Sequence, residues 1–511
     1  MIRDMVAAVS LANLCLIDVW FELLFMPAAS AYYLGAPRQR ADYVAAIADA
    51  ALIAAALLIV LRLARRIAPG PLRTAADICF CLVALLPVNT LRMNIKLPFG
   101  MGQLWRWIGL PGWQQAATVV AVIAVLSIAR WHRPAVRAVY ALLLVVSPFA
   151  LVTLVRAGAV VTGVLGVDAF ALPALAPAVK MADPMAPRVV WLLFDELDAS
   201  MIGAARPAGL ALPELDRLRE ESLDATAALP PSDQTLLSIP ALFTGRRVRE
   251  AHPRGPADLE VGFADDATLV SWSAQPNVFC DVRKDGLPTT IVGWYHPYCR
   301  LFAPCLSACV QEPVFLSVVA RDREAGLAER MAEEALSALP INNRRLAIRS
   351  YQRILAQASR AAAGREPGLV FVHFPVPHAP AIYDRARGRF TLARVSHVTG
   401  YVDNLALVDR ALGDLRRAMT ASGAWERSTV ILTADHAWRE SWAFDGRSRL
   451  EVPFLVKLAG EARPVPYARP LNTVLSADLV RALLRREVRT PEDLVRWLDG
   501  RELTAVSHTT P

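Results

Sequence analysis

The stretch Arg188-Val-Val-Trp-Leu-Leu-Phe-Asp195 decides the fold of the larger part of the chain. Its six consecutive apolar residues, with no polar break, are typical of a strand buried on both faces of a parallel sheet. The stretch Ser428-Thr-Val-Ile-Leu-Thr-Ala-Asp435 has the same character, and His436 follows it directly. Both predicted strands therefore end in a carboxylate, at the sheet edge where open α/β sheets bind their ligands.

A third stretch, Ser232-Asp-Gln-Thr-Leu-Leu-Ser-Ile-Pro-Ala-Leu-Phe-Thr-Gly245, predicts a short buried helix that stops at Thr244-Gly245. Thr235 falls in its first turn, where free backbone N–H groups and the helix dipole stabilise an alkoxide or bind a phosphate. Thr235 is therefore a candidate nucleophile, provided that a metal or a base lies beside it. The simpler interpretation is that Ser232, Asp233 or Thr235 only caps the helix.

In this order, the three stretches resemble the landmarks of the alkaline phosphatase and sulfatase superfamily, in its membrane-anchored branch of phosphoethanolamine transferases and lipoteichoic acid synthases. The resemblance covers roughly residues 188–494. Thr235-Leu-Leu-Ser-Ile-Pro240 is similar to the Thr-x-x-Ser-x-Pro of the phosphoethanolamine transferases, whose threonine is the nucleophile. In sulfatases the catalytic residue precedes a Thr-Gly by nine positions, and counting nine back from Thr244 selects Thr235 again.

The chain also departs from the sulfatase pattern. Thr235 cannot be oxidised to formylglycine, and no Cys or Ser is followed by x-Pro-x-Arg, so cleavage of sulfate esters is disfavoured. His436 stands where sulfatases commonly have Asn, which favours zinc or manganese over calcium. The resemblance thus implies one divalent metal, zinc or alternatively manganese, held by Asp195, Thr235, Asp435 and His436. A second metal is left open, because no second His-rich set is evident.

Further site residues are predicted around these landmarks. His378 lies in the loop Pro377-His-Ala-Pro380, and the resemblance implies that it contacts the substrate phosphate or protonates the leaving group, although a lone loop histidine is often inert. His373 alternates with apolar neighbours, so it is either a satisfied strand histidine or a substrate contact. The remaining substrate-binding candidates are Glu196, Trp438, Arg447 and Arg449, the arginines because a guanidinium binds phosphate through two hydrogen bonds.

Composition divides the chain into parts. The apolar content of 55% is concentrated before about Arg156, where five stretches approach the ~20 residues that a bilayer requires. We therefore predict a transmembrane domain at 1–157, a Pro- and Gly-containing linker at 158–187 and a catalytic domain at 188–511. The catalytic domain is predicted to be α/β and sulfatase-like, with a central, mostly parallel sheet flanked by helices. The predicted spans are Met5–Tyr33, Tyr43–Leu63, Ala75–Leu91, Gln114–Ile128 and Val139–Val155.

Charge and cysteine use indicate where the protein works. A modest arginine excess on one side of the spans predicts a cytoplasmic N-terminus and an outer catalytic domain. The net charge of +8 is spread through loops, which favours anionic lipid headgroups over nucleic acid as partners. Cys280, Cys299, Cys305 and Cys309 suggest two disulfides in an oxidising compartment, with three possible pairings, and a zinc site is the competing interpretation.

These features together predict a multi-pass protein of the bacterial inner (cytoplasmic) membrane whose catalytic domain lies on the periplasmic or extracellular side. We expect it to move a phosphate-linked headgroup from a lipid donor to an envelope acceptor through a covalent phospho-threonine. Two alternatives stay open. One is a sulfatase-like phosphodiesterase or other hydrolase acting on a glycan or soluble ester, and the other is a non-catalytic envelope binding protein. The oligomeric state and the identities of donor, transferred group and acceptor are not predicted.

Overall fold

The chain forms two compact units in the computed structural model, which describes residues 2–67, 70–94, 130–167, 170–177, 179, 183, 185–314, 324–337, 339 and 341–501. The helical unit contains Met1–Met26, Ala36–Phe170 and Ser317–Asn342. The α/β unit contains Pro27–Gly35, Ala171–Leu316 and Asn343–Pro511. Two segments, Pro27–Gly35 and Ser317–Asn342, therefore pack in a different unit from the residues on either side of them in the sequence.

The α/β unit is built on an eight-stranded mixed sheet. In spatial order its strands are β14 (Val465–Tyr467), β2 (Leu223–Ala225), β13 (Phe454–Lys457), β12 (Ser428–Thr433), β1 (Arg188–Phe194), β9 (Gly368–Phe374), β7 (Thr289–Trp294) and β8 (Ala308–Glu312). The strands from β12 to β8 are all parallel. β13 runs antiparallel to β12, and β2 runs antiparallel to β13. The centre of the sheet is thus parallel, as predicted, and one edge is mixed.

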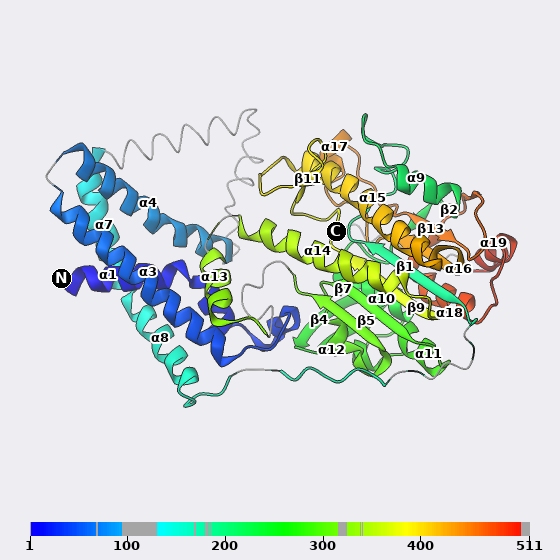
Figure 1. Cartoon of the computed structure of the whole chain (residues 1–511), viewed down its shortest axis with the longest axis horizontal. Helices are drawn as coiled ribbons and strands as arrows, with labels where there is room; N and C mark the ends of the chain where they lie inside the picture. The colour runs from blue at the N-terminus through cyan, green and yellow to red at the C-terminus, as the bar shows by residue number, and fades with distance from the viewer. Residues whose placement is uncertain are drawn as a thin grey trace. The chain divides into compact units, whose positions relative to one another are not determined.

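Strand β1 is buried on both faces, which confirms the interpretation of its apolar run. Alternate side chains of a strand point to opposite faces, so Val190, Leu192 and Phe194 enter one core, and Val189, Trp191 and Leu193 enter the other. The first core is covered by α9 (Pro213–Glu220), α14 (Asn342–Ala363) and α15 (His397–Ser422) (Figure 1). The second is covered by α10 (Thr235–Thr244), α11 (Val278–Lys284), α18 (Ser476–Leu484) and α19 (Pro491–Asp499).

Smaller elements surround this three-layer arrangement. β4 (Val248–Gly255), β5 (Asp258–Phe263) and β6 (Leu269–Ser271) form an antiparallel sheet, and the pairs β3 (Ala228–Leu229) with β15 (Leu471–Asn472) and β10 (Tyr383–Asp384) with β11 (Arg389–Phe390) form two more. The short helices are η2 (Ala28–Tyr33), η3 (Trp272–Ala274), α12 (Tyr298–Leu301), η4 (Ala303–Cys305), α16 (Ala424–Arg427), α17 (Trp442–Asp445) and η5 (Thr473–Leu475).

Two disulfides join the segments around β7 and β8. Cys280 pairs with Cys305, and Cys299 pairs with Cys309. This is one of the three pairings that the sequence left open, and it favours disulfides over the competing zinc site. The first bridge joins α11 to η4, and the second joins α12 to β8.

The helical unit contains α1 (Ile2–Cys15), α2 (Ile17–Trp20), η1 (Phe21–Phe25), α3 (Arg40–Arg66), α4 (Pro71–Asn94), α7 (His132–Val145), α8 (Ser147–Val161) and α13 (Leu327–Ser337). Among the described residues only α3 is long and apolar enough to cross a membrane by itself. Two bent pairs of helices, at 2–25 and 133–161, raise the number of candidate spans to three if each pair is one span.

The prediction of about five spans is therefore not supported. The first predicted span is bent by 68° at its break, and the fifth by 41° where α7 ends and α8 begins. Pro148 stands in the first turn of α8, and a proline there cannot donate the hydrogen bond that would continue α7 through the break. The fourth predicted span, Gln114–Ile128, lies outside the described residues. One to three apolar helices are consistent with a membrane anchor.

Candidate active site

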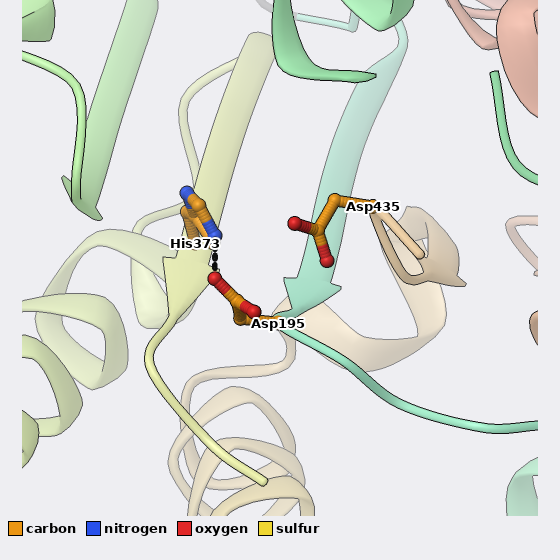
Figure 2. Close-up of side chains that lie close together, drawn as sticks. All are labelled: Asp195, His373 and Asp435. Carbon is orange, nitrogen blue, oxygen red and sulfur yellow. Dashed lines mark ion pairs between the residues drawn. The ribbon is translucent and has the colours of Figure 1, made fainter. Parts of the chain in front are cut away.

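Three neighbouring parallel strands bring their C-terminal ends together at the candidate site. Asp195 follows β1, Asp435 and His436 follow β12, and His373 is the last but one residue of β9. In the register of the sheet, Leu193 of β1 lies beside both Thr433 and His373. Figure 2 shows the side chains of Asp195, His373 and Asp435 pointing toward one another from these strand ends. Residues far apart in the sequence thus converge because parallel strands end at the same edge.

The ligand atoms of Asp195, His373 and Asp435 all lie within 4.8 Å of one another. His373 Nε2 is 3.7 Å from Asp195 Oδ2 (Figure 2). The sequence analysis placed His373 among the substrate contacts or the core residues, whereas the structure places it in the candidate metal cluster. The reason is the β1–β9 register, which no local pattern in the sequence reveals.

His436 lies next to both carboxylates of the cluster. Its Nε2 lies 3.5 Å from Asp435 Oδ2 and 3.8 Å from Asp195 Oδ1. Its Nδ1 faces the carbonyl oxygen of Ala437 at 2.9 Å, and an Nδ1–H that donates there leaves the Nε2 lone pair free for a metal. The residue pair Asp435-His436 therefore has the hydrogen bonding that metal-binding histidines commonly show.

The Thr235 hydroxyl lies in the same cluster. Oγ1 is 3.4 Å from Asp195 Oδ2 and 3.4 Å from His436 Nε2. Helix α10 begins at Thr235 and ends at Gly245, whose φ of 75° is left-handed, as the Thr-Gly stop predicted. Gln234, not Thr235, is the N-cap, and it makes no side-chain cap hydrogen bond. The capping interpretation thus does not account for Thr235, and the four predicted metal ligands do come together.

The cluster fits a divalent cation on its own chemistry. Asp195 and Asp435 are fully buried, and Asp195 Oδ1 and Asp435 Oδ2 have no hydrogen-bond partner among the described residues. A buried carboxylate oxygen without a partner is costly unless a cation compensates it. Carboxylates, imidazoles and a hydroxyl are suitable ligands for zinc or manganese.

The electrostatics of the cluster also favour a positive charge between the carboxylates. Burial by itself raises the pKa of Asp195, but His378, His373 and His436 together hold that pKa well below its ordinary value. Burial disfavours the charged form of His436, yet Asp435 and Asp195 outweigh this and raise its pKa. The lowered pKa of Asp195 favours its ionised form, and the raised pKa of His436 reflects a negative field that attracts a cation.

Glu196 and Arg439 form the wall beside the cluster. Glu196 has a φ of 67°, a conformation that is strained for a residue with a side chain, and its N–H donates to Asp435 Oδ1 at 3.1 Å. Its carboxylate accepts from Arg439 Nε at 3.4 Å, and Arg439 Nη2 lies 3.4 Å from His378 Nε2. Arg439 was missed in the sequence analysis, although its place three residues after His436 could have indicated it.

His378 and Trp438 both line a cavity of about 530 Å³ that adjoins Glu196. The His378 N–H donates to the carbonyl oxygen of Asp195 at 3.2 Å, which fixes the loop against the site. Trp438 is buried and stacks on Tyr401, with ring centroids 4.1 Å apart. The cavity therefore has room for a substrate group next to the cluster, and Trp438 shapes it through Tyr401.

Arg447 and Arg449 have other contacts. The Arg449 guanidinium pairs with Asp445, while Arg447 is exposed and its N–H donates to Asp445 Oδ1. These contacts give no support to phosphate binding by either arginine, which stays a prediction. Arg439 is the arginine that lies beside Glu196 and His378.

Two buried histidines of the site, His373 and His296, are held by hydrogen bonds to neighbouring side chains and backbone. His373 is fully buried, with Nδ1 2.9 Å from the Tyr298 hydroxyl and Nε2 accepting from Trp294 Nε1 at 3.2 Å. His296, which follows β7, has Nδ1 2.6 Å from the Tyr32 hydroxyl and Nε2 3.4 Å from the carbonyl oxygen of Thr235. Segment Pro27–Gly35, which belongs to the α/β unit, is thus linked through His296 to the backbone of the candidate nucleophile.

No protein-family model and no curated protein matches the chain. Among solved structures, the chain is similar to a phosphonate monoester hydrolase of Agrobacterium radiobacter, with 17% identity over 62% of this chain and 78% of that one and a TM-score of 0.41. It is also similar to a protein in the alkaline phosphatase superfamily from Vibrio parahaemolyticus, with 17% identity over 58% and 66% of the two chains and a TM-score of 0.38. A third match is the sulfatase PsFucS1 from Pseudoalteromonas sp., with 16% identity over 58% and 68% and a TM-score of 0.39.

The names of these structures include a sulfatase, a phosphonate monoester hydrolase and an alkaline phosphatase superfamily protein. The narrower resemblance to phosphoethanolamine transferases is not shown by them. At these identities and TM-scores they assign no substrate and no reaction to this chain. The function proposed below therefore rests on the geometry of the site itself.

Proposed function

We propose that the protein is a metal-dependent enzyme that cleaves a phosphate ester through Thr235. The observation that carries this proposal is the position of Thr235 Oγ1, 3.4 Å from both Asp195 Oδ2 and His436 Nε2 at the start of helix α10. A threonine hydroxyl is a weak nucleophile at its ordinary pKa, so it requires a partner that favours the alkoxide. The clustered ligands and the free N–H groups of the helix start provide such a partner.

Asp195, Asp435 and His436 would hold the metal, and Thr235 would be its nucleophilic ligand. His373 would lie beside them, with its Nε2 accepting from Trp294 Nε1. Bound Zn²⁺ or Mn²⁺ lowers the pKa of a ligating hydroxyl and neutralises charge on a phosphate. The Thr235 hydroxyl would release its proton to solvent, and Oγ1 would form a bond to phosphorus while the bond from phosphorus to the leaving oxygen breaks, which gives a phospho-threonine. His378, in a solvent-accessible loop, is suitably placed to give the leaving oxygen a proton.

In its finer form, we propose that the donor is a lipid and that the phosphate-linked headgroup passes to a hydroxyl of an envelope acceptor. Support comes from the apolar helices, which suit a multi-pass inner-membrane anchor, and from the disulfides, which suit an oxidising compartment outside the cytoplasm. Threonine cannot form formylglycine, so a phosphate ester is favoured over a sulfate ester. The second candidate is hydrolysis, in which water takes the phosphate from the same intermediate.

The test is intact-mass and peptide mass spectrometry of the full-length protein in detergent, loaded with zinc and exposed to a bacterial phospholipid extract. We expect an adduct on Thr235 in the wild type and none in Thr235→Ala. Thr244→Ala is the matched control, because this threonine lies at the other end of α10 and donates to the Pro240 carbonyl. The control should keep the adduct, and both variants should melt within a few degrees of the wild type.

The result also separates the remaining alternatives. An adduct that a hydroxylated envelope acceptor removes supports transfer, whereas one that only water removes identifies a hydrolase. A folded wild-type protein that binds no metal and forms no adduct with lipid or soluble phosphodiesters contradicts the proposal. That outcome would leave a non-catalytic envelope binding protein.

A further inference from the structure

A second cavity lies near the N-terminal ends of the parallel strands β1 and β12, whereas the catalytic cluster lies at their C-terminal ends. It has a volume of about 440 Å³ and is lined by the residues before β1, by the end of α16, by the start of β12 and by the segment after α18. Five arginines line it, and we call it the arginine pocket: Arg188, Arg365, Arg427, Arg486 and Arg489. No Asp or Glu is among its lining residues in the described part of the chain.

The arginine pocket is separate from the catalytic site. Arg188 is the first residue of β1, and Asp195 directly follows the last one. At about 3.3 Å per residue, β1 places roughly 20 Å between the two ends of the strand. A small substrate bound at Asp195 therefore does not reach the pocket, and the pocket requires a ligand of its own.

Arg188 forms the floor of the pocket. Its side chain is 6% exposed, and its two Nη atoms donate to the backbone carbonyls of Ala361, Ala362 and Glu366. Its Nε is buried and has no hydrogen-bond partner among the described residues. The guanidinium of this pocket-lining residue keeps its positive charge in a buried position, which favours an anion nearby.

The charges of the other arginines are compensated weakly. Arg365 Nε donates to the Ser422 carbonyl at 2.6 Å, and Arg489 Nε donates to the Arg486 carbonyl at 2.8 Å. Arg427 Nη2 lies 3.9 Å from the Met185 sulfur, which is a weak acceptor.

Arg486 is the exception, since it pairs with Asp183 at 3.2 Å. The negative group near Arg188 is Glu366, which partly offsets the effect of burial and of Arg427 on the arginine's pKa. The pocket lining itself has five guanidiniums and no carboxylate, which leaves an excess of positive charge at its wall. By contrast, arginines such as Arg206 and Arg416 elsewhere in the unit pair directly with carboxylates.

We propose that the arginine pocket binds a ligand that carries phosphate groups, as a site distinct from the catalytic centre. Guanidinium groups bind phosphate oxygens in pairs, so several arginines around one cavity suit a ligand with more than one phosphate or a highly charged one. The buried apolar residues Leu458, Leu483 and Val488 form the rest of the wall and can contact the group that bears the phosphate. Two sources share this chemistry: a soluble phosphorylated compound and a phospholipid headgroup.

The test uses the full-length protein in a neutral detergent. Pyrophosphate is titrated into it by isothermal titration calorimetry, and short-chain phosphatidic acid is titrated separately with the melting temperature as readout. The test variant is the double substitution Arg427→Gln with Arg489→Gln, which leaves the structural Arg188 in place. The control is Arg387→Gln with Arg417→Gln, which removes the same charge from exposed arginines paired with Asp384 and Asp414.

We expect binding of at least one probe to weaken about tenfold or more in the test variant, since each lost charge-assisted contact contributes at least that factor. The control should bind as the wild type does, and so should Asp435→Asn, which alters the catalytic centre instead. Binding of pyrophosphate alone identifies a soluble ligand class, and binding of phosphatidic acid alone identifies a lipid headgroup. The proposal is overturned if neither probe binds, or if the test variant binds as tightly as the control.

Discussion

His296 gives a prediction in which sign and size both follow from the structure. The imidazole is 1% exposed and lies between the Tyr32 hydroxyl and the Thr235 carbonyl. Burial, with a smaller electrostatic contribution from His373, lowers the pKa of His296 to about 3. The perturbation is His296→Gln, which keeps a side-chain amide able to donate to Thr235 but removes the titrating group.

The pKa shift fixes the direction of the pH dependence. Between pH 6.5 and pH 3 the unfolded chain holds a proton on His296 that the folded chain does not, so stability is lost as the pH falls through this window. With an unfolded pKa of about 6.5, lowering the pH from 7 to 5 costs the wild type about 2 kcal/mol of unfolding free energy at this residue. The Gln variant does not have this cost.

The measurement is urea denaturation of both proteins in detergent micelles at pH 7 and pH 5, followed by near-ultraviolet circular dichroism. The wild type should lose about 2 kcal/mol more than His296→Gln between the two pH values. Other titrating groups, such as Asp198, whose pKa burial raises to about 6, are common to both proteins and cancel in the difference. Equal losses in the two proteins would refute the assignment of His296 as a buried neutral histidine.

Three further predictions concern the metal, the support of the site and the core. Asp435→Asn should bring bound zinc, measured by atomic emission, well below one ion per chain and abolish turnover, whereas Asp445→Asn at an exposed position should keep both. Gly293→Ala should reduce kcat/KM about 10- to 100-fold without unfolding the protein. The added Cβ would lie 2.8 Å from Tyr298, whose hydroxyl contacts His373 of the cluster. Unchanged kinetics would show that the Tyr298–His373 contact is dispensable. Phe243→Ala should cost about 3–5 kcal/mol in urea denaturation, because this fully buried ring contacts six other aromatic rings and its removal leaves a cavity. A loss below 1 kcal/mol would contradict the packing.

The residues that could be predicted from the sequence are those that a local sequence pattern indicates. An apolar run that ends in an acid identified Asp195 and Asp435, because a strand buried on both faces tolerates no polar residue until it reaches the sheet edge. A helix start followed by a Thr-Gly stop identified Thr235. The disulfide-forming cysteines were recognised by type, but not by partner, since pairing depends on distance in space.

Other residues depended on contacts between segments that are distant in the chain. His373 joins the cluster only through the register between β1 and β9, and His296 lies behind Thr235 only because β7 is the next strand in the sheet. The arginine pocket likewise collects side chains from five separate segments. Hydropathy located the apolar stretches, but it did not predict the bends within two of them. These bends are set by local backbone hydrogen bonding and packing. Sequence by itself thus determined which elements form and where each ends, because these follow from local periodicity and side-chain chemistry. Only the tertiary structure decided which strand ends meet, because strand order and register are set by packing over the whole sheet.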